Sequence, residues 1–432
     1  MQINIPSETA PLKKVIVHTP GHEVSLVNPE LKDELLFDDI IFEEDAREEH
    51  LNMLKVFSAA MPDDGEIHEI TDLALKCLQS ELVRSKFVDQ LVKELPYENL
   101  AAVEDDLKEL NAAELLRFVV EGAISESHHF TLHPAPNLLF TRDLAAVTGT
   151  KIILSKAAKR ARARESLLME LILLHHPIFE KSKDQIIYTG GSQSIEGGDV
   201  LVVSDKIVLI GMSERTTFSG LVGVANKLLE GNVEHVLAVD IPKKRSSMHL
   251  DTIFTFADEN ECIVFPPAIE EQTNNVVELH KSGGSILSRQ HESLKSALEK
   301  LTGAKFNFIR CGGENRTTQF REQWTDGANV FALAPGVIVG YERNTKTFEA
   351  LKKNGYQLMT QFEFIEAYEN SPFDHKKSGK IAISFQGHEL CRGRGGARCM
   401  TLPILRKITS DLRNFPPFCP AVKVPFTASI GL

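Results

Sequence analysis

The sequence lacks long hydrophobic runs and an excess of basic residues, and each absence excludes a class of protein. Its apolar stretches, such as residues 200–203 and 207–210, have the length of a strand, whereas a helix that crosses a bilayer needs about 20 apolar residues. The 432 residues include 48 Lys and Arg against 60 Asp and Glu, a formal net charge of −12. Proteins that bind nucleic acids or anionic membranes in general need a basic surface. We therefore expect neither nucleic acid nor a membrane as a partner.

The sequence also lacks the signs of secretion and of a cysteine-based metal or disulfide framework. Residues 1–14 carry no apolar run behind a basic segment, which argues against a signal peptide. The six cysteines are scattered without a Cys-x-x-Cys pair, which disfavours both a zinc site and disulfides. These absences predict a cytoplasmic protein with reduced thiols, in which a cysteine is free to act in catalysis.

What the sequence does contain is a repeat of about 50 to 60 residues. Two apolar, β-branched runs flank a polar turn four times, and this pattern predicts β-hairpins. The predicted hairpins are residues 143–155, 199–210, 251–266 and 329–340. A helical pattern and then a strand-like run follow each hairpin. The predicted helices are residues 162–177, 214–229, 289–301 and 345–354, and the predicted strands are residues 185–188, 235–239, 305–309 and 356–359.

The repeat predicts one ring of modules rather than independent domains. A single β-β-α-β unit cannot bury its apolar face alone, so the copies must pack on one another. Residues 15–21 and 399–405 are expected to complete a fifth unit by closing the ring. Residues 71–129 break the pattern, because their apolar residues recur at helical spacing and Pro96 falls between two helical stretches. The predicted organisation is a catalytic domain of residues 1–70 and 130–432 with a helical insertion at residues 71–129.

Polar residues gather where the repeats begin. Asp143, Glu196, His249 and Asp251 stand at or before the starts of three hairpins, and Cys399 ends an Arg- and Gly-rich segment near the C-terminus. Each residue alone has a structural explanation, since aspartates cap turns and buried cysteines fill cores. Their occurrence in register with one repeat instead favours a common polar site on the axis of the ring.

The chemistry of this set favours nucleophilic attack on a cation. A thiol, a histidine and several carboxylates suit a cationic substrate, whereas acyl transfer would need an oxyanion hole and few neighbouring anions. A guanidinium offers planar N–H donors that two carboxylates can hold. A bound cation would also favour the thiolate, which the neighbouring aspartates disfavour.

Six strings, in the order in which they occur, carry a family resemblance. They are NLLFTRD, IEGGDVLV, SERTT, MHLDTIFTF, QWTDGANV and GRGGARCMT. Together with LLFDDI at residues 35–40, they resemble the arginine deiminase family of the guanidino-group-modifying superfamily, which contains amidinotransferases and deiminases. The resemblance covers nearly the whole chain. It implies a five-bladed α/β propeller of ββαβ modules with pseudo-fivefold symmetry and an inserted helical domain.

The resemblance also implies catalytic roles. Cys399 matches the nucleophile that attacks the guanidinium carbon. His249 and Glu196 match the pair that handles protons, and Asp143 and Asp251 match the carboxylates that bind the guanidinium nitrogens. The implied reaction converts L-arginine and water into L-citrulline and ammonia through a covalent S-alkylthiouronium on the cysteine. No metal or organic cofactor is expected.

Five further residues match positions that bind the substrate. Asn137, Arg162 and Arg215 match residues that hold the α-carboxylate end, Phe140 matches an apolar wall, and Arg394 matches a mobile residue near the thiol. Arg162 is placed by its spacing from Asp143 rather than by a distinctive string. We also expect a homo-oligomer.

Three other functions remain open at this point. An amidinotransferase would use the same cysteine, histidine and carboxylates but pass the amidino group to an amine. A dihydrolase would release ornithine. A non-catalytic arginine-binding protein would keep the fold without the reaction. Residues 360–392 extend beyond the length found in many family members, which makes substrate choice less predictable than reaction type.

Overall fold

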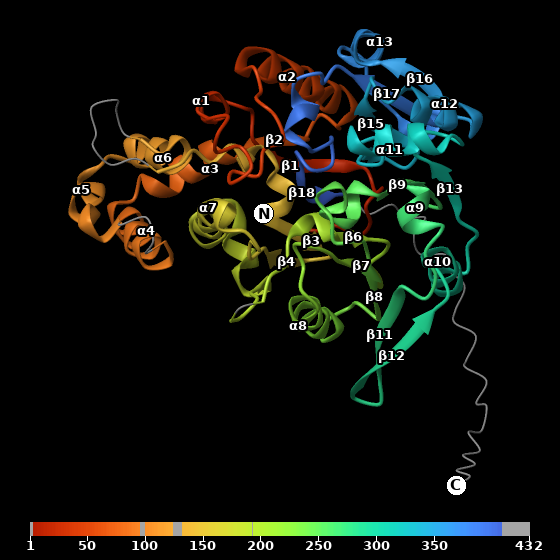
Figure 1. Cartoon of the computed structure of the whole chain (residues 1–432), viewed down its shortest axis with the longest axis horizontal. Coiled ribbons are helices and arrows are strands. Elements are labelled where there is room, and N and C mark those ends of the chain that lie inside the picture. Colours follow the sequence, from red (N-terminus) through yellow and green to blue (C-terminus); the bar gives the residue numbers. More distant parts are fainter. Residues whose placement is uncertain (1–2, 96–99, 124–131, 192, 408–432) are drawn as a thin grey trace.

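The strands of the protein form five small sheets with a shared pattern. The computed structural model describes residues 3–95, 100–123, 132–191 and 193–407, and the strands of these residues make five sheets. In each sheet two strands pair antiparallel, and a further strand runs parallel to one of that pair. Figure 1 shows the sheets around the middle of the molecule, with helices outside them.

The four predicted hairpins are all present. They are β3 (Ala145–Thr148) with β4 (Lys151–Leu154), β6 (Val200–Val202) with β7 (Ile207–Met212), β9 (Phe254–Asp258) with β10 (Glu261–Val264), and β14 (Phe331–Ala334) with β15 (Val337–Tyr341). Strands parallel to the second member are β5 (Ile186–Ile187), β8 (His235–Asp240), β13 (Asn307–Arg310) and β17 (Ile381–Phe385). Apolar runs around polar turns therefore predicted these pairs correctly.

Strands from near the start and near the end of the described chain form the fifth sheet, as predicted. Strand β1 (Leu12–Val17) pairs antiparallel with β18 (Leu402–Arg406) and parallel with β2 (Glu66–Glu69). The helix α2 (Glu43–Ala60) lies between β1 and β2 in the chain, as a helix does in the other units. The strand just beyond Cys399 therefore shares a sheet with the first strand of the chain.

Helices follow the hairpins near the predicted places, and two of them begin four or five residues later than predicted. They are α7 (Ala163–His175), α8 (Phe218–Leu229), α10 (Leu294–Thr302) and α12 (Thr345–Lys353). The face of α8 that carries Leu221, Val224 and Leu228 is buried, as expected for an amphipathic helix that covers a sheet. A capping box at Ser293 starts α10, so the predicted helix at residues 289–301 begins too early.

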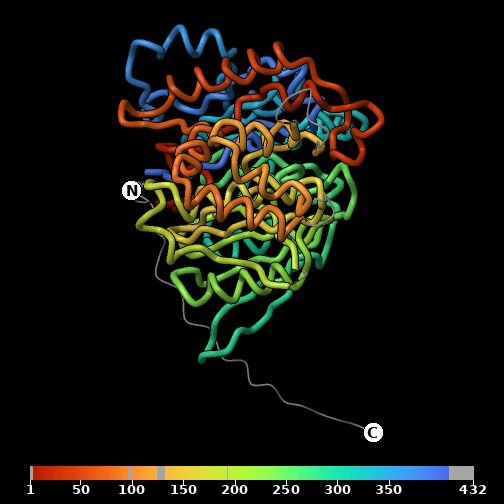
Figure 2. The backbone as a smooth tube through the Cα atoms, turned by 90° about the vertical axis from the view of Figure 1, so that its left-hand side faces the viewer, coloured from red at the N-terminus to blue at the C-terminus, as the bar shows by residue number. Residues whose placement is uncertain are grey.

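Residues 276–291 form a hairpin that the sequence reading missed. Strands β11 (Val276–Ser282) and β12 (Ser285–His291) join the edge of the second sheet through β8. Gly283 and Gly284 both have positive φ in the turn, a conformation that glycine adopts at little cost. The hairpin projects from the body of the molecule in both views (Figures 1 and 2). The fourth sheet also differs, because β17 separates the predicted strand β16 (Gln357–Thr360) from β15.

The predicted insertion is helical where the structure describes it. Its helices are α3 (Ile70–Leu78), α4 (Glu81–Glu94), α5 (Glu104–Glu109) and α6 (Ala112–Glu121), at the left of Figure 1. Most of its apolar stripe is buried against residues of β3, β4 and α7. Leu82 is an exception at 65% exposed. Pro96 and residues 124–129 lie outside the described residues. Among the described helices, none has the length and apolar character needed to cross a membrane.

The short helical turns that precede three of the hairpins pack against one another. They are η4 (Thr141–Leu144), η7 (Gly197–Asp199) and η9 (Leu250–Thr252), and each leads into the first strand of a hairpin. Turn η7 packs against both η4 and η9. The fold therefore brings the starts of three hairpins to one place.

Candidate active site

All ten residues predicted from the sequence gather in one buried region. Each is at most 6% exposed. Eight of them line a single cavity: Asn137, Phe140, Asp143, Arg162, Arg215, His249, Arg394 and Cys399. The other two contact this set, since Glu196 is paired with His249 and Asp251 lies beside Cys399. The structure thus brings the residues together, and their individual roles remain predictions.

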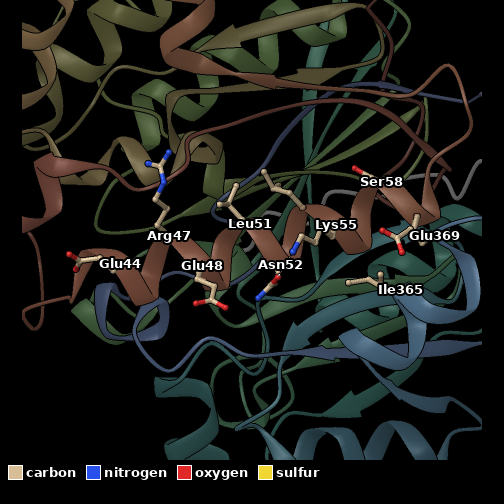
Figure 3. A pocket seen from close by; sticks show the side chains of 11 residues that line it. Glu44, Arg47, Glu48, Leu51, Asn52, Lys55, Ser58, Ile365 and Glu369 are labelled. Carbon is tan, nitrogen blue, oxygen red and sulfur yellow. Dashed lines mark hydrogen bonds between the residues drawn. The ribbon is translucent and has the colours of Figure 1, made fainter.

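The cavity is nearly closed. Its volume is about 10 Å³, which holds about one water molecule. A larger groove of about 620 Å³ runs along α2 beside Ile365 of α13 (Gln361–Tyr368), as Figure 3 shows. None of the ten predicted residues lines that groove. Size alone therefore does not locate the site in this protein.

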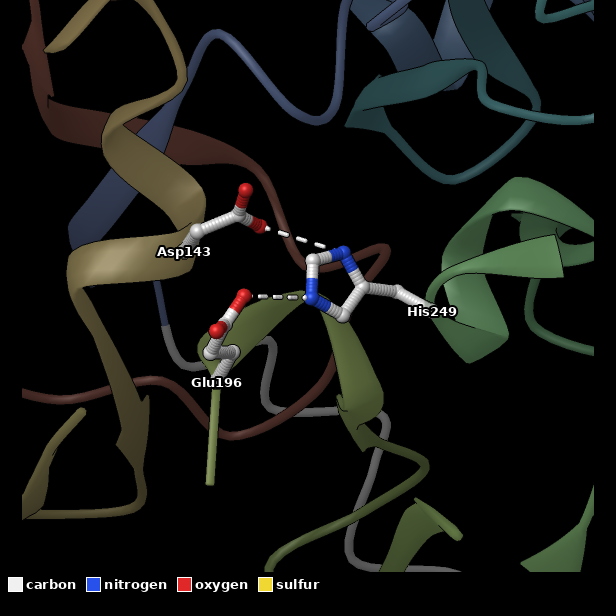
Figure 4. Close-up of side chains that lie close together, drawn as sticks. All are labelled: Asp143, Glu196 and His249. Atoms are coloured by element: carbon white, nitrogen blue, oxygen red, sulfur yellow. Dashed lines mark hydrogen bonds and ion pairs between the residues drawn. The ribbon is translucent and has the colours of Figure 1, made fainter. Parts of the chain in front are cut away.

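His249 lies between two carboxylates (Figure 4). Its Nε2 is 2.9 Å from Glu196 Oε2, and its Nδ1 is 3.5 Å from Asp143 Oδ1. Burial opposes the charged imidazolium, but Asp143, the hydrogen bond to Glu196 and the charge of Asp199 outweigh it and raise the pKa of His249 to about 9. The histidine is therefore protonated near neutral pH, as a general acid must be.

Glu196 is held in its charged form. Burial alone would raise its pKa, but the hydrogen bond and charge of His249, with Arg215 and Arg162, lower the pKa of Glu196 to about 2. Its Oε1 accepts a 2.9 Å hydrogen bond from the backbone N–H of Ala158. Glu196 and His249 thus form a fixed ion pair, which keeps the imidazole in one orientation.

Gly198 permits the close approach of His249 to Asp143. A Cβ at this position would lie 2.7 Å from His249 Cγ and Nδ1 and 2.9 Å from Asp143 Oδ1. These distances are shorter than van der Waals contact allows. The glycine in the Glu-Gly-Gly-Asp sequence is therefore needed for space beside the imidazole.

Asp143 and Asp251 share one arrangement. In each, Oδ2 pairs with a buried arginine: Arg162 for Asp143, and Arg398 at 2.7 Å for Asp251. In each, Oδ1 is buried and has no hydrogen-bond partner among the described residues. A buried acceptor without a partner is destabilising unless a ligand or ordered water satisfies it. Each aspartate therefore has one oxygen fixed by an arginine and one oxygen without a hydrogen bond, and the latter oxygen of Asp143 lies 3.5 Å from His249 Nδ1.

Cys399 lies beside Asp251. Its Sγ is 3.7 Å from Asp251 Oδ2, and its backbone N–H donates to Asn329 Oδ1 at 3.0 Å. Asn329 in turn donates to the carbonyl of Asp251 at 3.0 Å, so one asparagine fixes both residues. Burial raises the pKa of the Cys399 thiol, and the charges of Asp251, Asp143 and Asp326 raise it further.

Besides Asn329, two residues that were not predicted from the sequence hold the nucleophile loop, Arg398 and Glu8. Arg398, directly before Cys399, donates to both carboxylate oxygens of Glu8 at 3.0 and 3.1 Å in addition to Asp251. Burial of Glu8 is outweighed by Arg398 and Arg142, which lower the pKa of that carboxyl to about 2. Arg398 stands within one of the family strings and could have been found there, whereas nothing in the local sequence points to Glu8.

The residues predicted to bind the substrate's α-carboxylate are placed differently from one another. Arg162 is tied to Asp143, to Glu165 at 2.7 Å and to the carbonyl of Asn137 at 2.9 Å. The side-chain amide of Asn137 donates to the carbonyl of Leu35 at 2.6 Å. Arg215 is 2% exposed, and its Nε has no partner among the described residues. The Nη1 of Arg215 lies 3.7 Å from Glu196 Oε2, so its Nε is the part of this guanidinium that remains open to a new anion.

Asp143, Glu196 and His249 are also the one set of described residues with the spacing of metal ligands. One donor atom from each lies within 4.8 Å of the others. Carboxylates and imidazole bind divalent metals, but the imidazole must be neutral to do so. Because both ring nitrogens face carboxylates and the pKa of His249 is raised to about 9, the set favours a proton over a metal ion.

Known proteins resemble this chain along most of its length. A family model described as Arginine deiminase matches residues 101–406. The arginine deiminase of Listeria monocytogenes serovar 1/2a is 34% identical over 94% of this chain and 98% of that protein. The arginine deiminase of Mycoplasma capricolum is 34% identical over 96% of this chain and 99% of that protein.

Solved structures with a similar fold have much lower identity. An amidinotransferase from Microseira wollei superposes with a TM-score of 0.53 at 13% identity, over 96% of this chain and 99% of that chain. The N-terminal domain of a cyanobacterial arginine dihydrolase gives a TM-score of 0.51 at 14% identity, over 91% and 97%. At such identity these two show only the mixed α/β fold. The family match and the curated relatives, by contrast, show that the chain belongs to the arginine deiminase family.

Proposed function

We propose that the protein hydrolyses the guanidinium group of free L-arginine to L-citrulline and ammonia. The observation that carries this proposal is the pair of buried aspartates, Asp143 and Asp251, each with Oδ2 held by an arginine and Oδ1 without a hydrogen bond from the described residues. A buried acceptor left unpaired costs about 1–3 kcal/mol, and a guanidinium supplies planar N–H donors that satisfy such acceptors. Cys399 beside Asp251 then lies near the carbon to be attacked.

The reaction proceeds through a covalent adduct on Cys399. The sulfur attacks the central guanidinium carbon, a C–N bond breaks, and His249 gives its proton to the departing nitrogen, so that ammonia leaves. An S-alkylthiouronium remains on the sulfur. Water then loses one proton to His249 while its oxygen attacks the same carbon. Cleavage of the C–S bond, with loss of the remaining hydroxyl proton to solvent, releases L-citrulline and the thiolate. Each assisted proton transfer contributes about 10²–10⁴-fold.

The cationic substrate itself assists the nucleophile. The pKa of the Cys399 thiol is raised by burial and by three aspartates, so the thiolate is disfavoured without a cation nearby. A guanidinium on Asp143 and Asp251 offsets these negative charges and favours loss of the thiol proton to solvent. Arg394, which lines the same cavity, adds positive charge near the sulfur. No metal or organic cofactor is required.

The other end of the substrate is held by Arg215, Arg162 and Asn137, with Phe140 as an apolar wall for the methylene chain. All four line the cavity, and the unpartnered Nε of Arg215 supports a contact with the α-carboxylate. Because the cavity volume is about 10 Å³, the lining must separate when the substrate binds.

A product assay tests the proposed function. The purified protein is incubated with L-arginine alone, and citrulline, ammonia and ornithine are measured. Equal amounts of citrulline and ammonia support the proposal. Turnover that needs an added amine would identify an amidinotransferase, and ornithine would identify a dihydrolase. Binding of arginine without any product would identify a non-catalytic arginine-binding protein.

We also propose a five-bladed α/β propeller of ββαβ modules, formed by residues 1–70 and 130–432, with residues 71–129 as an inserted helical domain. The shared pattern of five sheets, one of which joins the two chain ends, supports this organisation. We further propose that the active protein is a cytoplasmic homo-oligomer. Light scattering on the protein as it elutes from a size-exclusion column tests the assembly, and the mass of a single chain would contradict it.

A further inference from the structure

Trp324, the single tryptophan of the chain, lies against Arg394. The guanidinium Cζ of Arg394 is 3.9 Å from the centre of the indole ring, a distance that gives a cation–π attraction. The Nη1 of Arg394 also donates to the main-chain carbonyl of Trp324. Trp324 is the last residue of α11 (Arg316–Trp324), where helix carbonyls carry partial negative charge. The ring and the carbonyl of one residue therefore hold the same guanidinium.

The remaining contacts of the Arg394 guanidinium also come from outside the reacting groups. Its Nη2 donates to the carbonyl of Ser246 at 3.4 Å, and its Nε is 3.4 Å from Asp38 Oδ2. The preceding residue of α11, Gln323, donates to the same Ser246 carbonyl at 2.5 Å, which fixes α11 beside the segment that leads to His249. Arg394 has φ of 66°, a left-handed conformation that few non-glycine residues adopt. The position of its side chain is therefore set by several specific contacts.

This position places Arg394 in the wall of a nearly closed cavity. Arg394 and Cys399 line the cavity of about 10 Å³, which holds about one water molecule and is far too small for a guanidino amino acid. The contacts of Asp143, Glu196 and His249 with one another do not involve Arg394. Arg394 is therefore a part of the cavity wall that is free to move without breaking the ion pairs that hold the proposed catalytic groups.

We propose that Trp324 is a positioning residue that holds Arg394 in the closed arrangement, and that binding of a free guanidino amino acid releases Arg394 from the indole. This inference rests on the proposed function. It assigns Trp324 no contact with the substrate, since Trp324 does not line the cavity. Because the substrate must overcome the contact between Trp324 and Arg394, that contact weakens substrate binding.

Fluorescence of the single tryptophan gives the first test. L-Arginine is added to the Cys399→Ala protein, which should bind it without turnover, and the emission of Trp324 is followed. The emission is expected to change and to saturate, because the guanidinium leaves the ring. In the protein that also carries Arg394→Ala, no such change is expected. Emission that stays constant while calorimetry shows saturating binding would overturn the proposal.

Binding affinity gives the second test, by calorimetry in the Cys399→Ala background. Trp324→Ala is expected to bind L-arginine about 3–10-fold more tightly, which corresponds to the loss of one cation–π contact. Trp324→Phe keeps an aromatic ring and should restore most of the original affinity. Phe320→Ala, which removes an exposed aromatic ring from the same helix, should leave affinity unchanged.

The outcomes separate this inference from the proposed function. If Trp324 had only a structural role, Trp324→Ala would bind L-arginine more weakly or would unfold. Equal or weaker affinity of Trp324→Ala for L-arginine would overturn the inference but would not affect the proposed reaction. Failure of the Cys399→Ala protein to bind arginine, together with no citrulline from the unaltered protein, would overturn both.

Discussion

The Sγ of Cys399 lies 3.7 Å from Oδ2 of Asp251, so the proposed nucleophile is next to an anion. A nucleophilic cysteine is usually activated by a neighbouring cation that lowers its pKa. Here burial and the aspartates raise the pKa of the thiol instead. The arrangement is productive only for a substrate that brings its own positive charge. A neutral substrate analogue would leave the thiol protonated.

Replacing Asp251 should therefore make the thiol more acidic. In Asp251→Asn the negative charge beside Cys399 is lost while the side chain keeps its size, so the pKa of Cys399 should fall. The rate of alkylation by iodoacetamide, measured against pH and localised to Cys399 by peptide mass, reports this pKa. Asp205→Asn, on an exposed turn, should leave unchanged the pH at which the alkylation rate of Cys399 is half-maximal. An unchanged or higher midpoint in Asp251→Asn would show that Asp251 does not control the thiol.

Gly198→Ala should lower kcat strongly and lower the free energy of unfolding only moderately. The new methyl group would meet His249 and Asp143 at 2.7 and 2.9 Å, so the imidazole must shift away from its carboxylates. Overpacking of this kind costs about 1–3 kcal/mol of folding free energy, whereas a displaced general acid costs about 10²-fold in kcat. Gly190→Ala is the matched control, because its Cβ has nothing within 4 Å. Full activity in Gly198→Ala would contradict the geometry around His249.

The pH dependence should follow His249. Because carboxylates raise its pKa to about 9, the protonated form needed by the leaving ammonia persists up to that pH and is lost above it. In the free enzyme kcat/KM should thus decline above about pH 9. Glu196→Gln removes a charge and a hydrogen-bond acceptor, so the pKa of His249 should fall and the decline should move to lower pH. If kcat/KM of Glu196→Gln declined at the same pH as that of the unaltered protein, a group other than His249 would be responsible for the decline.

Much of this site was predictable because its signals are local. The hairpins follow from apolar runs on either side of polar turns, and Asp143, His249 and Cys399 stand in short distinctive strings at their edges. Convergence of these residues followed from the repeat, since equivalent edges of packed modules meet. The same local reading predicted that residues 15–21 and 399–405 would share a sheet, as β1 and β18 do.

The features that were missed depend on contacts distant in sequence or on weak local patterns. Glu8 pairs with Arg398 across 390 positions, and no property of the N-terminal segment indicates that partner. Strands β11 and β12 are mostly polar, and β12 is largely exposed, so only the Gly283-Gly284 turn marked them. The bond between Arg162 and Asp143 was also not foreseen, because the sequence indicates charges but not which oppositely charged group each will meet.

Arg215 should affect substrate binding more than chemistry. Its buried, unpartnered Nε is proposed to hold the α-carboxylate, so Arg215→Lys should raise KM about 10-fold, as for one lost charged contact, with a smaller change in kcat. Agmatine, which lacks that carboxylate, should be a poor substrate for both forms and should not distinguish them. Asp143→Ala should instead lose turnover with either substrate. Loss of turnover in Arg215→Lys with a mild effect in Asp143→Ala would reverse these assignments.

The central claim is that Cys399 carries the substrate through a covalent intermediate, and rapid acid quenching tests it most directly. The protein is mixed with L-arginine, quenched within one turnover, digested and analysed by mass spectrometry. The peptide that contains Cys399 should gain the mass of arginine less ammonia, and Cys399→Ala should give neither this adduct nor citrulline. Turnover by Cys399→Ala near the rate of the unaltered protein, or an adduct on a different residue, would contradict the account.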